Sequence, residues 1–180
     1  MYCATPYSLF SVNTSTNEIE RFSRVTGLNE TGIRTIKYDE TSNKLFIAYQ
    51  NSNIDILYRN DIYNIPDIKR DNVIGDKNIY NIYPLGKNYY LSTGLGVIVI
   101  DGDRYEVKDT WLIGSGGSQV KVNGFASDSS FYYAATEEGL KKVAMNSTDP
   151  ANYSNWQSVS GINGLPTGAC RNVFSIQDKI

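Results

Sequence analysis

The sequence predicts an all-β fold, namely a segment of β-propeller with about four four-stranded antiparallel blades that forms part of a larger propeller. Three observations predict it. A motif recurs about every 44 residues, the apolar runs are short and alternate with polar residues, and tyrosine accounts for 14 of the 180 residues. A four-stranded unit repeated every ~40–50 residues is typical of propellers, because radial stacking buries both faces of each sheet. A β-sandwich is the alternative fold.

The repeat is anchored on a small residue, which a polar turn and an apolar strand follow. The anchors succeed one another at intervals of 44, 44 and 43 residues and are Ala4, Ala48, Ser92 and Ala135. Apolar runs before and after each anchored segment add the first and last strands, which gives four strands per unit. The turns carry the hairpin signals SNK, GKN, DGD and DSS. No apolar stripe of helical period is long enough to compete with this reading.

The domain boundaries follow from the repeat. We expect one propeller segment over residues 1–180, made of a partial blade at 1–25, blades at about 32–68, 78–113 and 121–160, and the first strand of a next blade at 169–176. Two arrangements are compatible with this division. The favoured one is a stretch of a longer propeller with both ends inside a blade. In the other, the last strand completes the sheet of residues 1–25 and brings Cys170 beside Cys3, where a disulfide would form instead of two buried thiols.

Composition excludes several classes of function. Lys and Arg number 17 against 19 Asp and Glu, a net charge of −2, so the chain has no electrostatic footprint for nucleic acid. The most apolar segment, residues 94–101, is far shorter than the ~20 residues of a membrane span, so we expect no direct membrane span. The chain has no histidine, which removes Ser-His-Asp and Cys-His nucleophiles, HExxH zinc sites and most transition-metal sites.

We therefore expect no enzyme activity, no catalytic residue, no cofactor and no metal, and the ligand-binding residues stay unknown. Three carboxylate pairs are the candidates for acid–base chemistry or calcium binding, but all lie in expected turns, where solvated side chains are the favoured interpretation: Asp39–Glu40, Asp101–Asp103 and Glu137–Glu138. The aromatic candidates for sugar-stacking platforms are expected mostly to pack one blade on another: Tyr89, Tyr90, Tyr132, Tyr133, Trp111 and Trp156.

The segment YYAATEEGLKK at residues 132–142 resembles the two-component regulator propeller repeat, which occurs in periplasmic sensors of Bacteroidetes hybrid two-component systems. The pattern of that repeat is an aromatic residue, a small residue, Thr, a short turn and Gly-Leu. Ala135, Thr136, Gly139 and Leu140 match it, whereas residues 50–53 depart from it by one inserted residue and lack the Gly-Leu.

Nearly the whole chain resembles the N-terminal β-propeller of the PorZ-like type IX secretion system surface proteins, most specifically in IYNIPDIKR at residues 62–70. The resemblance implies an exported Bacteroidetes protein at the cell surface and outer membrane, with further blades and a C-terminal sorting domain in a longer parent chain. It also implies partners in the outer-membrane attachment complex, namely a PorU-like sortase or anionic lipopolysaccharide. No ligand-contact motif of the family falls on identifiable positions, so no site residue carries over.

Two functions are expected from these residues, and a third is disfavoured. The first is a non-enzymatic scaffold of a PorZ-like protein that binds a partner protein or anionic lipopolysaccharide. The alternative is a periplasmic, glycan-sensing propeller of a hybrid two-component histidine kinase. A propeller lyase or glycosidase needs convergent carboxylates or a histidine, which the sequence does not offer.

Overall fold

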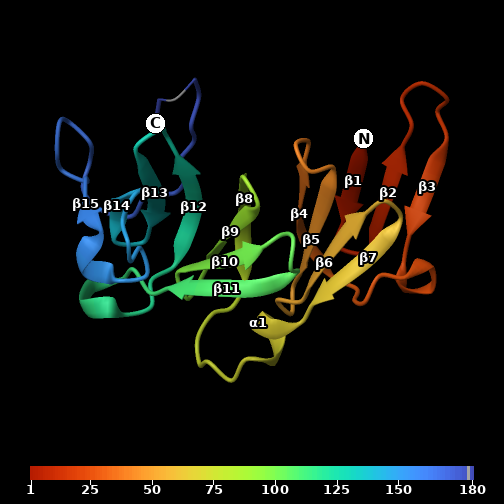
Figure 1. Cartoon of the computed structure of the whole chain (residues 1–180), viewed down its shortest axis with the longest axis horizontal. Coiled ribbons are helices and arrows are strands. Elements are labelled where there is room, and N and C mark those ends of the chain that lie inside the picture. The colour runs from red at the N-terminus through yellow and green to blue at the C-terminus, as the bar shows by residue number, and fades with distance from the viewer. Residues whose placement is uncertain (178) are drawn as a thin grey trace. The chain divides into compact units, whose positions relative to one another are not determined.

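The computed structural model describes residues 1–177 and 179–180, and the fold is all-β, as the repeat predicts. The named strands form four antiparallel sheets, one of three strands and three of four, and in each sheet the strand order follows the sequence (Figure 1). We call these sheets blades 1 to 4. The chain divides into two compact units, residues Met1–Asn72 and Val73–Ile180, which are described one at a time.

The first unit holds blades 1 and 2. Blade 1 consists of β1 (Tyr2–Thr5), β2 (Ser8–Val12) and β3 (Ile19–Phe22), and the 3-10 turn η1 (Arg24–Thr26) follows it. Blade 2 consists of β4 (Ile33–Asp39), β5 (Lys44–Tyr49), β6 (Ile54–Tyr58) and β7 (Asp61–Ile65), and ends in the short helix α1 (Asp67–Arg70). The two sheets share a core whose buried members are Leu9, Leu28, Ile33, Leu45, Ile47, Tyr49 and Leu57.

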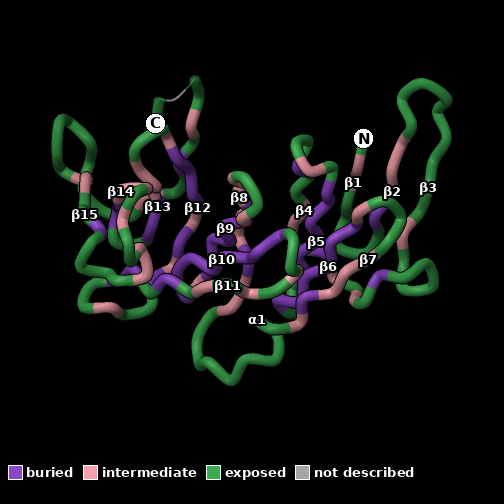
Figure 2. Tube along the Cα trace, in the orientation of Figure 1, coloured by how far each residue is buried: buried purple, intermediate pink, exposed green. Residues whose placement is uncertain are grey.

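The second unit holds blades 3 and 4. Blade 3 consists of β8 (Ile79–Leu85), β9 (Asn88–Thr93), β10 (Val97–Asp101) and β11 (Glu106–Trp111). After the 3-10 turn η2 (Ser115–Gly117), blade 4 consists of β12 (Val122–Ser127), β13 (Phe131–Thr136) and β14 (Gly139–Ala144), then η3 (Tyr153–Asn155) and the two-residue β15 (Gln157–Ser158). Buried residues concentrate in the middle strands of the sheets, whereas the loops are largely exposed (Figure 2).

The four anchors of the repeat occupy equivalent places. Each lies one residue before the end of a strand, which is β1 in blade 1 and the second strand in blades 2 to 4, and pairs with the following strand near its first residue. The pairs are Ala4 with Leu9, Ala48 with Ile54, Ser92 with Val97 and Ala135 with Leu140. This equivalence confirms the predicted period, because a sandwich of unrelated strands would not place the four residues alike.

A threonine at the end of the second strand explains the Thr…Gly pattern of the repeat. The Thr136 hydroxyl donates to the Gly139 carbonyl at 2.7 Å and accepts from the Glu138 N–H at 3.1 Å. Thr93 makes the equivalent bond to the Gly96 carbonyl at 2.9 Å. The hydroxyl thus supplies the hydrogen bonds that close the turn, a local device that Ser and Thr side chains commonly provide.

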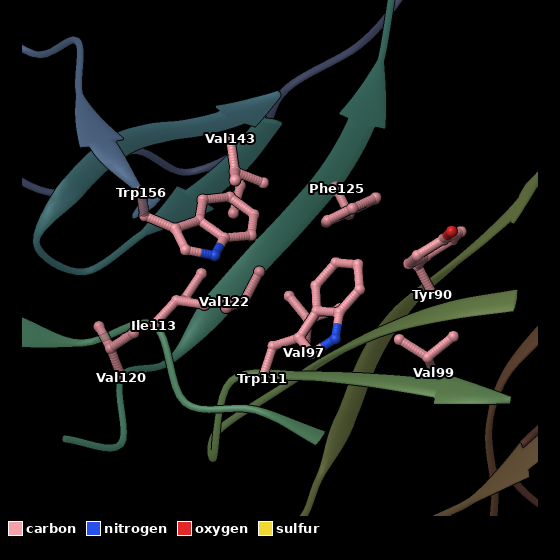
Figure 3. Close-up of a cluster of buried hydrophobic side chains, with 11 residues drawn as sticks. Tyr90, Val97, Val99, Trp111, Ile113, Val120, Val122, Phe125, Val143 and Trp156 are labelled. Atoms are coloured by element: carbon pink, nitrogen blue, oxygen red, sulfur yellow. The ribbon is translucent and has the colours of Figure 1, made fainter. Parts of the chain in front are cut away.

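The aromatic side chains of the second unit pack blade 3 against blade 4, as expected for most of them. Tyr90 of β9 stacks on Phe125 of β12 with ring centroids 4.9 Å apart and an interplanar angle of 7°. The Trp111 and Trp156 rings lie 6.2 Å apart in the same cluster, where side chains from both sheets point toward one another (Figure 3). Tyr132 joins this face through a 3.1 Å bond between its hydroxyl and that of Tyr90. The four candidates among them are packing groups rather than an exposed stacking platform, namely Tyr90, Trp111, Tyr132 and Trp156.

The neighbouring tyrosines face the other way, as the period of two along a strand requires. Tyr89 is buried, and a Cβ added at Gly102 would lie 2.2 Å from its ring. The half-buried Tyr133 donates to the Asp128 carboxylate at 2.7 Å and packs near the C-terminal segment.

Residues 169–176, expected to start a further blade, do not form a strand among the described residues; Ile176 alone makes a bridge, to Lys179. The segment is instead bound to blade 4 by separate contacts. The Cys170 N–H donates to the Thr136 carbonyl at 2.8 Å, and Val173 packs on Ala126 and Ala135. A strand needs a continuous ladder, which these contacts do not supply. Cys3 and Cys170 are both free thiols, and both are half-buried rather than buried.

Candidate binding site

The candidate binding site lies at one end of each four-stranded sheet. There the loop entering the first strand lies beside the turn between the second and third strands: the Gln50 N–H donates to the Gly32 carbonyl at 2.8 Å in blade 2, and the Glu137 N–H to the Lys121 carbonyl at 3.1 Å in blade 4. We call this end of a blade its turn edge. Loops presented by rigid sheets are where binding residues commonly lie.

A β-bulge recurs at the turn edge in the first strand of all three four-stranded sheets. The cross-strand register shifts by one residue at the same place in β4, β8 and β12, and the extra residues are Arg34, Tyr80 and Asn123. Such bulges often re-aim a side chain beside a functional site. The Asn123 amide, for example, donates to the Cys170 carbonyl at 2.9 Å and to Glu137 Oε1 at 3.2 Å.

The third-strand residue that directly follows the partner of the anchor is buried in three blades but differs in charge: Asp55 in blade 2, Ile98 in blade 3 and Lys141 in blade 4. Asp55 is 0% exposed, and its carboxylate accepts four hydrogen bonds. Two come from the Asn29 backbone N–H and side-chain amide, at 2.8 and 2.9 Å, and the others from the Tyr49 hydroxyl at 2.7 Å and the Asn64 amide at 2.8 Å. Burial, together with the bond to Asp55, raises the pKa of Tyr49.

Lys141 has the opposite charge and a corresponding role. It is 9% exposed, and its ammonium donates to the Ile113 carbonyl at 2.7 Å and to Glu138 Oε2 at 2.6 Å. The Glu138 carboxylate also accepts from the Ser115 hydroxyl at 2.8 Å. Ile113 and Ser115 belong to the loop that enters blade 4, as Asn29 belongs to the loop that enters blade 2. In both blades, therefore, a buried charge in the third strand fixes the incoming loop at the turn edge.

The loop fixed by Lys141 borders a hollow of about 430 Å³, which we call the Lys141 hollow. Its wall is formed by the η2 and η3 turns and by the start of β14, and its polar members are Ser115, Glu138, Lys141, Tyr153, Ser154 and Ser158. Hydrogen bonds from Lys141 and Ser115 hold the pKa of Glu138 below its ordinary value. The hollow thus presents a fixed ion pair, hydroxyl groups and an aromatic ring.

The three predicted carboxylate pairs are not built as acid–base pairs, and two of their members are buried rather than solvated. The Asp39 carboxylate accepts from the Thr41 N–H at 3.0 Å and the Ser42 hydroxyl at 2.6 Å. Asp101 accepts from the N–H groups of Asp103 and Arg104, at 2.9 and 3.1 Å, and these bonds lower its pKa. Both side chains cap hairpin turns, which explains why Asp occurs there.

The side chains of Glu137 and Glu138 have different partners. Glu138 accepts from Lys141 and Ser115 at the hollow, whereas Glu137 lies 3.8 Å from the Lys121 ammonium and accepts from Asn123. Across residues 1–177 and 179–180, no group of three or more acidic, Cys or His side chains is placed to hold a metal ion.

Sequence reasoning missed Asp55 and Lys141. The signal was present, since each interrupts an apolar third strand, Asp55 as a lone charge in NIDILY and Lys141 as the first of two lysines in GLKKVA. Only an alignment of the third strands, which the anchors make possible, shows that the two charges occupy one position of the repeat.

A family model described as the N-terminal β-propeller domain of PorZ, of the type IX secretion system, matches residues 1–157. The chain belongs to this family. The solved structure of PorZ, an essential bacterial surface component of the type IX secretion system of Porphyromonas gingivalis, is similar over 97% of this chain at a TM-score of 0.83 and 24% identity. The chain spans 23% of that PorZ chain. No curated protein matches the sequence.

Two sensor structures from B. thetaiotaomicron share the fold. The extracellular domain of a putative one-component system is similar over 98% of this chain and 23% of its own, at a TM-score of 0.72 and 14% identity. The extracellular domain of a putative hybrid two-component system is similar over 97% of this chain and 22% of its own, at a TM-score of 0.65 and 16% identity. These likenesses agree with the two resemblances stated from the sequence. No helix among the described residues is long and apolar enough to cross a membrane.

Proposed function

We propose that this PorZ-type propeller is a non-enzymatic binding scaffold of an exported type IX secretion component at the cell surface and outer membrane. Its partner is anionic lipopolysaccharide or a protein of the attachment complex, such as a PorU-like sortase. The observation that carries the proposal is the turn edge, where buried charges fix the incoming loops and leave polar side chains accessible. Rigid loops bind without a large cost of ordering, because they are already held in one conformation.

Lys121 is the residue through which we test this role. Its ammonium lies 4.5 Å from the centroid of the Tyr80 ring and 3.8 Å from Glu137, and its side chain is 39% exposed at the turn edge of the second unit. Because its ion pair with Glu137 is long and its side chain is partly exposed, the Lys121 ammonium is able to contact anionic groups of a glycan or an acidic protein surface.

The test is the binding of the chain to purified anionic lipopolysaccharide and to the PorU-like sortase of the same bacterium, measured by biolayer interferometry. We expect binding to at least one of them, and we expect Lys121→Ala to weaken it at least about threefold, which is in the range for one interfacial charge. Lys87→Ala is the matched control, since Lys87 also makes a long ion pair, at 3.7 Å to Asp101, but lies at the opposite end of its blade. Failure to bind either partner contradicts the proposal.

The alternative function is a periplasmic, glycan-sensing propeller of a hybrid two-component histidine kinase. It is supported by the Thr136–Gly139 turn of the regulator repeat and by the fold shared with two extracellular sensor domains. The gene sequence downstream of residue 180 separates the two. A transmembrane helix followed by a kinase favours the sensor, and a sorting domain favours the scaffold.

A further inference from the structure

The Lys141 hollow combines an ion pair with an accessible aromatic ring, and we propose that it binds one neutral, hydroxyl-rich pyranose ring. This inference rests on the proposed function, because it names the class of ligand that one turn edge takes.

The charge inside the hollow is already balanced. The Lys141 ammonium donates to Glu138 Oε2 at 2.6 Å, and the Ser115 N–H and hydroxyl donate to the same carboxylate at 3.1 and 2.8 Å. Glu138 therefore occupies the position that a bound phosphate or carboxylate would take beside the ammonium and the glycine-rich loop. A second anion would be repelled at short range, so the hollow favours an uncharged ligand.

The same groups keep capacity for hydroxyls. An ammonium has three protons, and Lys141 uses two of them, for Ile113 and Glu138. A carboxylate has about four acceptor positions, and three donor groups already use Glu138, namely the Ser115 N–H, the Ser115 hydroxyl and the Lys141 ammonium, so about one position is left. Neighbouring sugar hydroxyls donate and accept at once, so a pair of them is able to bridge this ammonium and carboxylate. A purely apolar ligand would leave both groups without new partners.

Tyr153 supplies a face for the ring of the sugar. Its side chain is 44% exposed, and it packs over Gly117, where an added Cβ would lie 3.0 Å from Tyr153 Cδ1. Gly117 adopts φ +78°, a conformation in which other residues are strained. The backbone thus positions the tyrosine, whereas Trp156 is buried in the core and its indole N–H donates to Pro150. The C–H face of a pyranose packs well on such a ring.

The size of the hollow agrees with this ligand. Small-molecule sites measure ~300–1,000 Å³, and about 430 Å³ places the Lys141 hollow at the low end, suited to one ring rather than to a long peptide segment.

The experiment is saturation-transfer NMR of the chain with methyl glycosides of glucose, galactose and mannose, N-acetylglucosamine, and the methyl glycosides of glucuronic and galacturonic acid. We expect at least one neutral sugar to receive saturation, and we expect glucuronic and galacturonic acid to bind at least about threefold more weakly than that sugar. Tyr153→Ala should weaken binding about three- to tenfold. Glu138→Gln, which nearly preserves shape, should also weaken it. Tyr7→Ala is the control, since Tyr7 is 90% exposed in the first unit.

Three results would overturn the inference. They are no saturation of any neutral sugar, stronger binding of a uronic acid than of its neutral counterpart, and unchanged binding in Tyr153→Ala when circular dichroism shows that this variant is folded. If Tyr153→Ala unfolds, Glu138→Gln decides in its place. Binding of lipopolysaccharide or sortase that persists in Glu138→Gln while no small sugar binds refutes the hollow and leaves the scaffold role intact, so the two failures are distinguishable.

Discussion

Replacement of Asp55 by alanine should destabilise the first unit more than any other single change of a polar side chain there. The carboxylate is fully buried and accepts from Asn29, Tyr49 and Asn64, which belong to a loop, to β5 and to β7. Asp55→Ala removes the acceptor of four hydrogen bonds, although the Asn64 amide keeps its bonds to Asn53 Oδ1 at 3.1 Å and to the Ile54 carbonyl at 3.0 Å. Each unsatisfied buried donor costs ~1–3 kcal/mol, but the two asparagines are part-buried and regain water. We therefore expect Asp55→Ala to lower the free energy of unfolding by about 3–5 kcal/mol.

Asp55→Asn should lower the free energy of unfolding less, by about 2 kcal/mol. It keeps one acceptor oxygen, but its amide N–H groups face the remaining donors and form no hydrogen bond with them. Urea unfolding followed by far-UV circular dichroism measures both changes. At a slope of about 2 kcal/mol/M, Asp55→Ala should lower the midpoint by about 1.5 M or more. Asp61→Asn, an exposed aspartate of the same sheet, is the control and should stay within ~0.5 kcal/mol of the parent. An Asp55→Ala variant no less stable than Asp61→Asn would refute the reasoning.

Three further predictions follow from the second unit. Phe125→Ala should lower the free energy of unfolding by about 3–5 kcal/mol, because Phe125 is buried and stacks on Tyr90 between two sheets. Urea unfolding followed by tryptophan fluorescence measures this change, and a decrease below ~1 kcal/mol would contradict the prediction. Gly96→Ala should be far more destabilising than Gly86→Ala, since a Cβ at Gly96 would lie 2.2 Å from the Trp111 carbonyl oxygen, whereas a Cβ at Gly86 would meet open space. Equal urea midpoints for the two variants would argue against the turn geometry. Folding lowers the pKa of Glu138, so the stability that this carboxylate contributes is present above its ordinary pKa of 4.5 and is lost as the pH falls. Glu138→Gln should therefore flatten the acid side of a plot of unfolding free energy against pH. A plot parallel to that of the parent chain would contradict the assignment.

The sequence alone was sufficient for the fold because the anchors repeat a local constraint. Ala48 and Ala135 recur where a small residue precedes a tight turn, and the apolar alternation around them requires sheets with two buried faces. The end of the chain was harder to predict. Residues 169–176 have strand-like composition, yet whether such a segment forms a strand depends on a partner strand, which a local pattern does not show.

The candidate site was less accessible to sequence reasoning. From the sequence alone, a charged residue in a third strand is expected to be exposed, because its partners are not known. The partners of Lys141 are a backbone carbonyl 28 residues away and Glu138, a carboxylate three residues away. Asp39 and Asp101 were expected to be solvated because they lie in turns, but their carboxylates are buried by the N–H groups that they cap. A long-range contact decided the case of Lys141, and hydrogen bonds within the turn decided those of Asp39 and Asp101.

The most direct test of the account is hydrogen–deuterium exchange of the chain, with and without anionic lipopolysaccharide or the PorU-like sortase. If the turn edge is the binding surface, exchange should slow in the loop entering blade 4, residues 112–121, and in the turn at residues 136–139. Protection confined to the opposite ends of these blades, at residues 85–88 and 127–131, would contradict the claim that the fixed loops carry the function.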